Sequence, residues 1–193
     1  EQKGILFSEL EDKFLLDFID AMKLPEVIEV LEAMPSDDVA DLLGKLPSDQ
    51  ADKFLNEMKS EGSEEVEELL SYDDDTAGGI MIPDFIALKE DSIAREAIAS
   101  IQKDYVDVEM PFYIYVIDEF ERLVGVISLR QLVVVQPDTP LKNFMATDIF
   151  SVKTGTDQEE VAKLVARYDI LAVPVVDESN VLVGIVTVDD VID

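Results

Sequence analysis

The sequence predicts an α+β multidomain protein, in which a short all-α superhelical domain precedes a tandem pair of α/β units. Three observations support this prediction. A helical phrase recurs near the N-terminus, an acidic stretch with two glycines interrupts the pattern, and the remainder repeats one alternation of apolar strands and amphipathic helices. The expected domains span residues 1–72, 73–139 and 140–193.

The first domain contains three related phrases, which begin at Leu24, Met34 and Leu46. In each phrase a proline is followed by acids and by apolar residues three or four positions apart, which is the pattern of a short helix. Helices this short are unstable in isolation, so we expect them to stack on one another in a small superhelix. A further helix is expected over residues 61–72.

The second half of the chain repeats itself at a spacing of 59 residues, which separates Gly125 from Gly184 and Asp118 from Asp177. A polar turn between two apolar runs in each copy is typical of a β-hairpin. One copy alone would bury too little surface to be stable, so we expect the two copies to pack their sheets together. The expected opening strands span residues 85–88 and 149–152, and the expected helices after them span residues 92–102 and 157–168.

An acidic stretch separates the two halves, where Asp73, Asp74 and Asp75 are followed by Gly78 and Gly79. Three consecutive acids lack the alternating ligand spacing and the glutamate at position twelve that define an EF-hand. We interpret this stretch as a linker that leads into the second domain.

The composition limits the classes of function. The chain has 44 acidic and 15 basic residues and a formal net charge of −29, which repels nucleic acid and favours cations as partners. It has no cysteine and no histidine, which excludes thiolate nucleophiles, the usual zinc sites and the commonest general base. Nothing indicates a pair of catalytic acids in an aromatic cleft, so we expect no enzyme activity. No apolar run is long enough to span a membrane, so we expect the chain as given to be soluble. It begins without methionine and stops within an acidic helical pattern, so we expect an excised piece of a longer protein.

Each repeat ends on a glycine between apolar residues followed by Ser or Thr, as in LVGVISLRQ from Leu123 and LVGIVTVDD from Leu182. Together with the lead-in YDDDTAGGIM, these phrases resemble a pair of cystathionine-beta-synthase (CBS) domains behind the acidic N domain of the MgtE family of magnesium transporters. The resemblance implies a sensor at the cytoplasmic face of the cell membrane, which dimerises through its CBS domains. It also implies that bound Mg2+, for which Ca2+ or Mn2+ could substitute, closes the pore of a transmembrane domain that follows Asp193.

The same resemblance implies which residues bind the ions. Mg2+ prefers oxygen ligands, takes one or two carboxylates and keeps several waters. The implied ligands are Asp37, Asp41, Asp157, Glu159, the backbone carbonyl of Ala166, Asp169, Asp190 and Asp193.

Each group of implied ligands also has a purely structural interpretation. Thr156 and Glu159 have the spacing of a capping box at a helix start. The two C-terminal acids, three positions apart, fit a solvated helix face. Asp37 and Asp41 share a helix face at a spacing of four, but acids at helix starts recur in the neighbouring phrases.

An adenine-nucleotide sensor that regulates another enzyme or channel is a second hypothesis, because many CBS pairs bind such nucleotides. Tyr113 and Arg130 stand where contacts to the base and the phosphates of ATP are expected. The first copy has Gln131 where the family has the aspartate that holds the ribose, which weakens the case for ATP. Comparing thermal stabilisation by Mg2+ with that by ATP would separate the two hypotheses.

Overall fold

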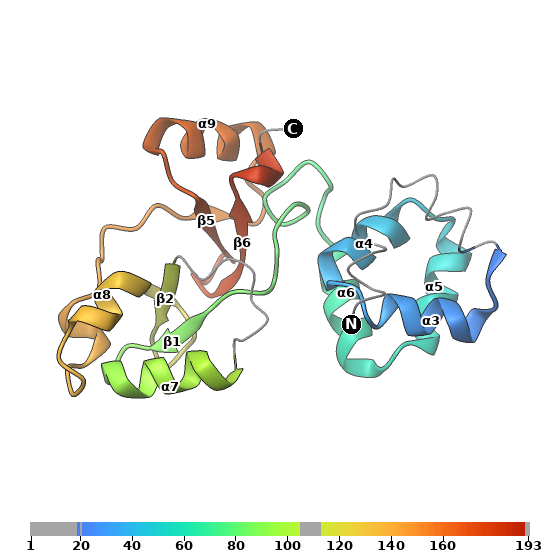
Figure 1. Cartoon of the computed structure of the whole chain (residues 1–193). Coiled ribbons are helices and arrows are strands. Elements are labelled where there is room, and N and C mark those ends of the chain that lie inside the picture. The colour runs from blue at the N-terminus through green and yellow to red at the C-terminus, as the bar shows by residue number, and fades with distance from the viewer. Residues whose placement is uncertain (1–18, 20, 105–112, 192–193) are drawn as a thin grey trace. The chain divides into compact units, whose positions relative to one another are not determined.

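The computed structural model describes residues 19, 21–104 and 113–191. The chain divides into two compact units, residues 1–73 and 74–193 (Figure 1). None of the helices within the described ranges is long and apolar enough to cross a membrane.

Unit 1 is helical where it is described, and its short helices pack on one another as the recurring phrase predicts. Each helix buries one apolar stripe, such as Val39 and Leu43 of the second and Phe54 of the third. The last helix ends earlier than expected, because the amides of Ser71 and Tyr72 bond three residues back and close a turn. The described helices are α3 (Leu24–Leu31), α4 (Ser36–Gly44), α5 (Ser48–Glu57) and α6 (Ser60–Leu69).

Unit 2 contains two copies of one α/β fold (Figure 1), which confirms the predicted tandem repeat. In each copy the first strand runs parallel to the second, and the second pairs antiparallel with the third. The first copy comprises β1 (Ala87–Lys89), α7 (Ala94–Asp104), β2 (Tyr113–Ile117), β3 (Leu123–Ser128) and α8 (Leu129–Val134), followed by η1 (Leu141–Asn143). The second copy comprises β4 (Val152–Lys153), α9 (Gln158–Tyr168), β5 (Ala172–Val176), β6 (Leu182–Thr187) and η2 (Asp189–Val191).

The two copies share an apolar core, as the marginal size of one copy led us to expect. Tyr115 and Leu123 of the first copy belong to the same buried cluster as Val176, Leu182 and Ile185 of the second. A separate cluster lies within the first copy, where Ile86, Ile114, Ile127, Leu132 and Leu141 are almost completely buried.

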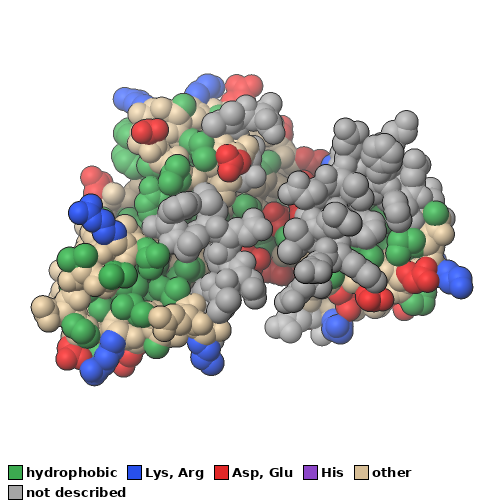
Figure 2. Space-filling view, in the orientation of Figure 1, with side chains coloured by type: hydrophobic (Ala, Val, Ile, Leu, Met, Phe, Trp, Pro, Cys, Tyr) green, Lys and Arg blue, Asp and Glu red, His purple; other side chains and the backbone are tan. Residues whose placement is uncertain are grey.

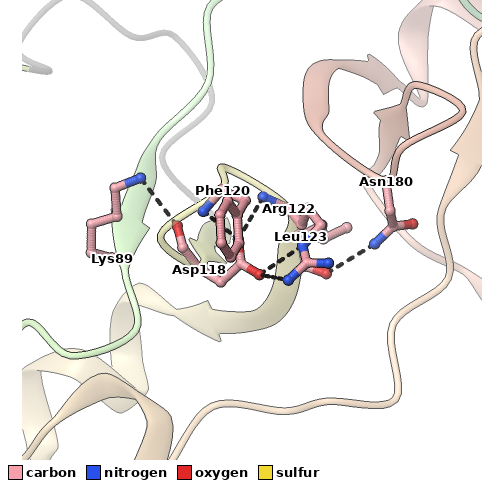
Figure 3. Close-up of polar contacts among 6 residues, drawn as sticks. All are labelled: Lys89, Asp118, Phe120, Arg122, Leu123 and Asn180. Atoms are coloured by element: carbon pink, nitrogen blue, oxygen red, sulfur yellow. Dashed lines mark hydrogen bonds and ion pairs between the residues drawn. The ribbon is translucent and has the colours of Figure 1, made fainter.

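The two hairpin turns bond to each other (Figure 3). They are built alike, because Asp177 in the second turn accepts from the amides of Ser179 and Val181, both at 2.8 Å, much as Asp118 does in the first. The Asp118 carboxylate accepts hydrogen bonds from the amides of Phe120 and Arg122, at 2.8 and 3.0 Å. It also accepts from the Arg122 guanidinium, at 2.8 Å from Nε. The amide of Leu123 then donates to the carbonyl of Asn180 in the other turn, at 3.0 Å. These bonds join the hairpins of the two copies.

The segment that precedes each copy crosses over to the other copy. Ile82 exchanges two backbone hydrogen bonds with Ile185, at 2.7 and 2.9 Å, and Ala146 exchanges two with Val126, both at 2.9 Å. The opening strands β1 and β4 therefore begin later than expected, at Ala87 and Val152 instead of residues 85 and 149. The apolar residues directly before them pack within their own copies: Ile86 lies in the core of the first copy, and Phe150 stacks on Tyr168 in the second.

Candidate metal sites

The start of α9 carries the first two predicted ligands, Asp157 and Glu159. Asp157 is the N-cap of the helix, and its Oδ1 accepts a hydrogen bond of 2.8 Å from the amide of Glu159. The predicted capping box of Thr156 with Glu159 is therefore wrong. The Thr156 hydroxyl instead accepts from the amide of Lys153 at 3.1 Å, which fixes the turn before the helix.

Both acids at this helix start face solvent. Asp157 and Glu159 are exposed, and Glu159 forms a long ion pair with Lys163, 3.4 Å and one helical turn away. An exposed pair of this kind contributes little to stability. Because the cap uses one oxygen of Asp157, the other carboxylate oxygen remains for an ion.

The other two predicted ligands of this region lie at the opposite end of α9. Ala166 is exposed in the last turn, and Asp169 is the C-cap, in the left-handed conformation with φ 53° and ψ 44°. The two caps, Asp157 and Asp169, are roughly 18 Å apart, because each helical residue adds about 1.5 Å. A Mg2+–oxygen bond is only about 2.1 Å long, so one ion cannot bind at both ends. The four residues define two separate candidate positions.

Asp37 and Asp41 lie one turn apart on α4 in unit 1. Burial, together with the charges of Asp38 and Asp41, raises the pKa of Asp37 from its ordinary value of 3.8 to about 6. A carboxylate that is half-buried beside other acids is costly to ionise, and a nearby cation would lower that cost.

The C-terminal pair is only partly placed. The backbone of Asp190 lies in the short 3-10 helix η2, directly after the buried strand β6. Its side chain and the whole of Asp193 lie outside the described part of the chain. The prediction for this pair therefore stays a prediction.

Within residues 19, 21–104 and 113–191, no group of three or more acidic side chains is arranged to hold a metal ion. The candidate positions instead present one or two acids each. This arrangement is compatible with Mg2+, which keeps most of its water shell and binds few carboxylates.

The sequence interpretation overlooked a neighbour of the α9 site. The acidic stretch taken as a linker is bound to the second copy: the carbonyl of Asp75 accepts from the amide of Gln158 at 2.9 Å, and the amide of Ala77 donates to the carbonyl of Thr156 at 2.7 Å. Ala77 is completely buried. The repeated dipeptide Asp-Thr, at Asp75 and again at Asp138, is the signal that could have indicated a shared structural role.

The residues predicted to contact a nucleotide lie in the first copy. Tyr113 in β2 is paired with Ser128 in β3, two residues before Arg130 at the start of α8. Gln131 forms a capping box with Ser128: its Oε1 accepts from the Ser128 amide at 2.9 Å and from the Ser128 hydroxyl at 2.8 Å. The side chain at the expected ribose position is thus engaged in the helix cap.

Comparison with protein families matches nearly the whole chain. Residues 1–75 match the family described as MgtE intracellular N domain, and residues 77–138 and 141–193 match the CBS domain. The chain is 49% identical over 129 residues to the magnesium transporter MgtE of Thermus thermophilus, an alignment that covers 67% of this chain and 29% of that protein. The chain thus spans less than a third of the curated relatives that it matches.

Two solved structures resemble the chain over 98% of its length. One is the cytosolic domain of the Mg2+ channel MgtE in complex with ATP, with a TM-score of 0.91, 38% identity and 78% of that chain covered. The other is the soluble part of a magnesium transporter, with a TM-score of 0.93, 38% identity and 75% of that chain covered.

Proposed function

The chain belongs to the MgtE family, and from this premise we propose that it is the Mg2+-sensing regulatory region of a magnesium channel or transporter. In this proposal the region lies at the cytoplasmic face of the membrane and acts on a transmembrane domain of the same protein. Its role is regulatory and not catalytic. The observation that carries the proposal is the likeness, over 98% of the chain, to the cytosolic domain of a Mg2+ channel.

The charge of the chain supports a cation-dependent switch. With a formal net charge of −29, acidic faces of the two units would repel each other. A pair of like charges about 4 Å apart costs about 4 kcal/mol at an effective dielectric constant of about 20, before screening by salt. Mg2+ between such faces would replace repulsion by bridging and favour a compact, pore-closed state.

The number of candidate positions agrees with the free energy that a switch requires. Inverting an equilibrium from 1:99 to 99:1 needs about 5.5 kcal/mol. One site that exists only in the compact state contributes about 1.4 kcal/mol at ten times its dissociation constant, so about four sites suffice. The proposed positions are the Asp37 face of α4, the two ends of α9, and the Asp190–Asp193 segment.

We also propose that two copies of the chain associate through their CBS domains. Residues 122–137 contain no acid although the chain has 44, and this stretch includes α8. Val133 and Val134 on α8 are 67% and 77% exposed. Figure 2 shows hydrophobic side chains gathered on the visible face of unit 2. A second copy could cover such a surface without repulsion between like charges.

Small-angle scattering of the whole chain tests the switch. We expect millimolar MgCl2 to reduce the radius of gyration, and NaCl at equal ionic strength to leave it larger. The variant Asp157→Asn should weaken the response, because asparagine keeps the helix cap but lacks the charge. Equal compaction by NaCl and MgCl2 would show that screening is sufficient and would refute Mg2+ bridging.

A nucleotide-sensing role is the alternative. It is favoured by the proximity of Tyr113 to the start of α8, where Arg130 lies, and by the ATP complex of the similar cytosolic domain. ATP in a metal-free buffer should then raise the melting temperature, and Arg130→Ala should abolish that rise. Stabilisation by MgCl2 alone would favour the Mg2+ sensor.

A further inference from the structure

The two crossing segments of unit 2 have the same architecture but meet different side chains. We name residues 75–82 the first lead-in and residues 137–146 the second lead-in. The first lead-in bonds to the start of α9, and the second bonds to the start of α7, where the amides of Ala94 and Arg95 donate to the carbonyls of Thr139 and Pro137, both at 3.0 Å.

The first lead-in completes the beginning of α9. Thr76 forms an antiparallel bridge with Asp157, and the Asp75 carbonyl takes the hydrogen bond of the Gln158 amide, which has no partner within its own helix. The Asp157 carboxylate accepts the hydrogen bond of the next amide, that of Glu159. The first turn of α9 is therefore satisfied jointly by the lead-in and by a proposed Mg2+ ligand.

The second lead-in provides a natural comparison without such ligands. Ile93 bridges Pro140 in the same way that Asp157 bridges Thr76. Ile93 and Asp157 are 64 positions apart, and the same spacing makes Arg95 the counterpart of Glu159. Arg95 forms an exposed ion pair of 2.8 Å with Asp138. Where the second copy has two acids, the first copy has an apolar and a basic residue.

We infer that docking of the first lead-in and Mg2+ binding at the start of α9 stabilise each other, an inference that rests on the proposed function. An ion bound to Asp157 and Glu159 would hold the first helical turn, and that turn holds the lead-in. Coupling of this kind is reciprocal, so loss of docking must weaken the ion to the same degree. The boundary between the two compact units falls after residue 73, two residues before the first lead-in begins.

A methionine anchors each lead-in and offers a matched pair of variants. A methyl group added at Gly184 would lie 2.8 Å from Met81 Cγ and 3.1 Å from the Ile82 carbonyl oxygen. A methyl group added at Gly125 would lie 2.8 Å from Met145 Cγ. Gly184→Ala should therefore loosen the first lead-in, and Gly125→Ala the second.

Hydrogen exchange of the whole chain, followed by NMR with and without MgCl2 at matched ionic strength, tests the inference. At ten times the dissociation constant of the ion, full coupling raises amide protection about 11-fold. We expect a rise of several-fold up to this limit at Ala77, Gly78 and Gln158, and no change at Ala94 and Arg95. In Gly184→Ala the MgCl2 concentration that gives half of the rise in protection should increase several-fold. In Gly125→Ala this concentration should stay unchanged.

Three results would overturn the inference. Protection that rises in α9 but not at Ala77 and Gly78 would show that ion and lead-in are independent, while leaving the proposed function intact. An equal rise at Ala94 and Arg95 would show general stabilisation instead of local coupling. No change at the start of α9, together with no Mg2+-specific compaction, would refute the proposed function as well. The wild-type measurement decides among these results even if a glycine variant fails to fold.

Discussion

Replacing Asp37 by asparagine should stabilise the protein at neutral pH. Burial, followed by the nearby charge of Asp38, raises the pKa of Asp37 from 3.8 to about 6. The protonated form therefore favours folding, and this contribution is complete below pH 3.8 and lost as the pH rises through about 6. Asparagine cannot ionise, so the variant avoids the loss.

The size of the effect follows from the shift in pKa. At about 1.36 kcal/mol per pKa unit, ionised Asp37 disfavours the folded state by about 3 kcal/mol above pH 7. Water around the partly exposed carboxylate screens its charge, so we expect a measured gain of about 1 to 2 kcal/mol. Urea unfolding followed by circular dichroism, in metal-free buffer from pH 4 to 8, measures it. The gain should be near zero at pH 4 and reach its plateau above pH 7.

Asp49→Asn is the matched control, because Asp49 occupies the corresponding position in the first turn of α5 but is exposed. We expect it to change the free energy of unfolding by less than about 0.5 kcal/mol at any pH. If Asp37→Asn has the same effect at pH 4 as at pH 8, the ionised carboxylate is not the cause and the argument fails. If Asp37 is also a ligand, millimolar MgCl2 should reduce the advantage of the variant.

Three further predictions concern unit 2. Asp157→Ala should lose about 1 kcal/mol of stability because it removes the helix cap, whereas Asp157→Asn should lose little. Both variants should bind Mg2+ more weakly in calorimetry. Unchanged Mg2+ binding by the asparagine variant would show that Asp157 is not a ligand. Ile127→Ala, which empties a fully buried position, should cost about 2 to 5 kcal/mol in urea unfolding, and a loss below about 1 kcal/mol would contradict its place in the core. Burial acts to raise the pKa of Asp118, but hydrogen bonds from Arg122 and two backbone amides outweigh it and leave the pKa below 3.8. Asp118→Asn (Figure 3) should therefore destabilise the chain more than Asp177→Asn, whose turn has Val181 in place of the arginine, and this difference should fade as the pH falls below 3.8.

Local patterns in the sequence were sufficient to predict the architecture. The spacing of apolar residues identified the short helices of unit 1, and the 59-residue repeat identified the two α/β copies. The same spacing placed Asp37 and Asp41 on one helix face. Such features depend on residues close together in the chain, where helix and strand geometry impose fixed periods.

The N-cap of α9 could not be predicted from local patterns alone. Thr156 and Asp157 are both good N-cap residues, and the sequence favoured the first because Glu159 completes a capping box with it. The structure selects Asp157, because the Thr156 hydroxyl is already bonded to Lys153 and its carbonyl to Ala77 of the first lead-in. A contact between segments about 80 residues apart thus decided between two local alternatives.

The sequence by itself determined the fold class, the repeat, the membership of the MgtE family and the acidic character that favours cations. Only the tertiary structure decided that each lead-in binds the opposite copy and that Asp37 is buried enough for its pKa to rise. The physical reason is that burial and crossing contacts arise between distant segments, whereas periodicity and spacing record only near neighbours along the chain.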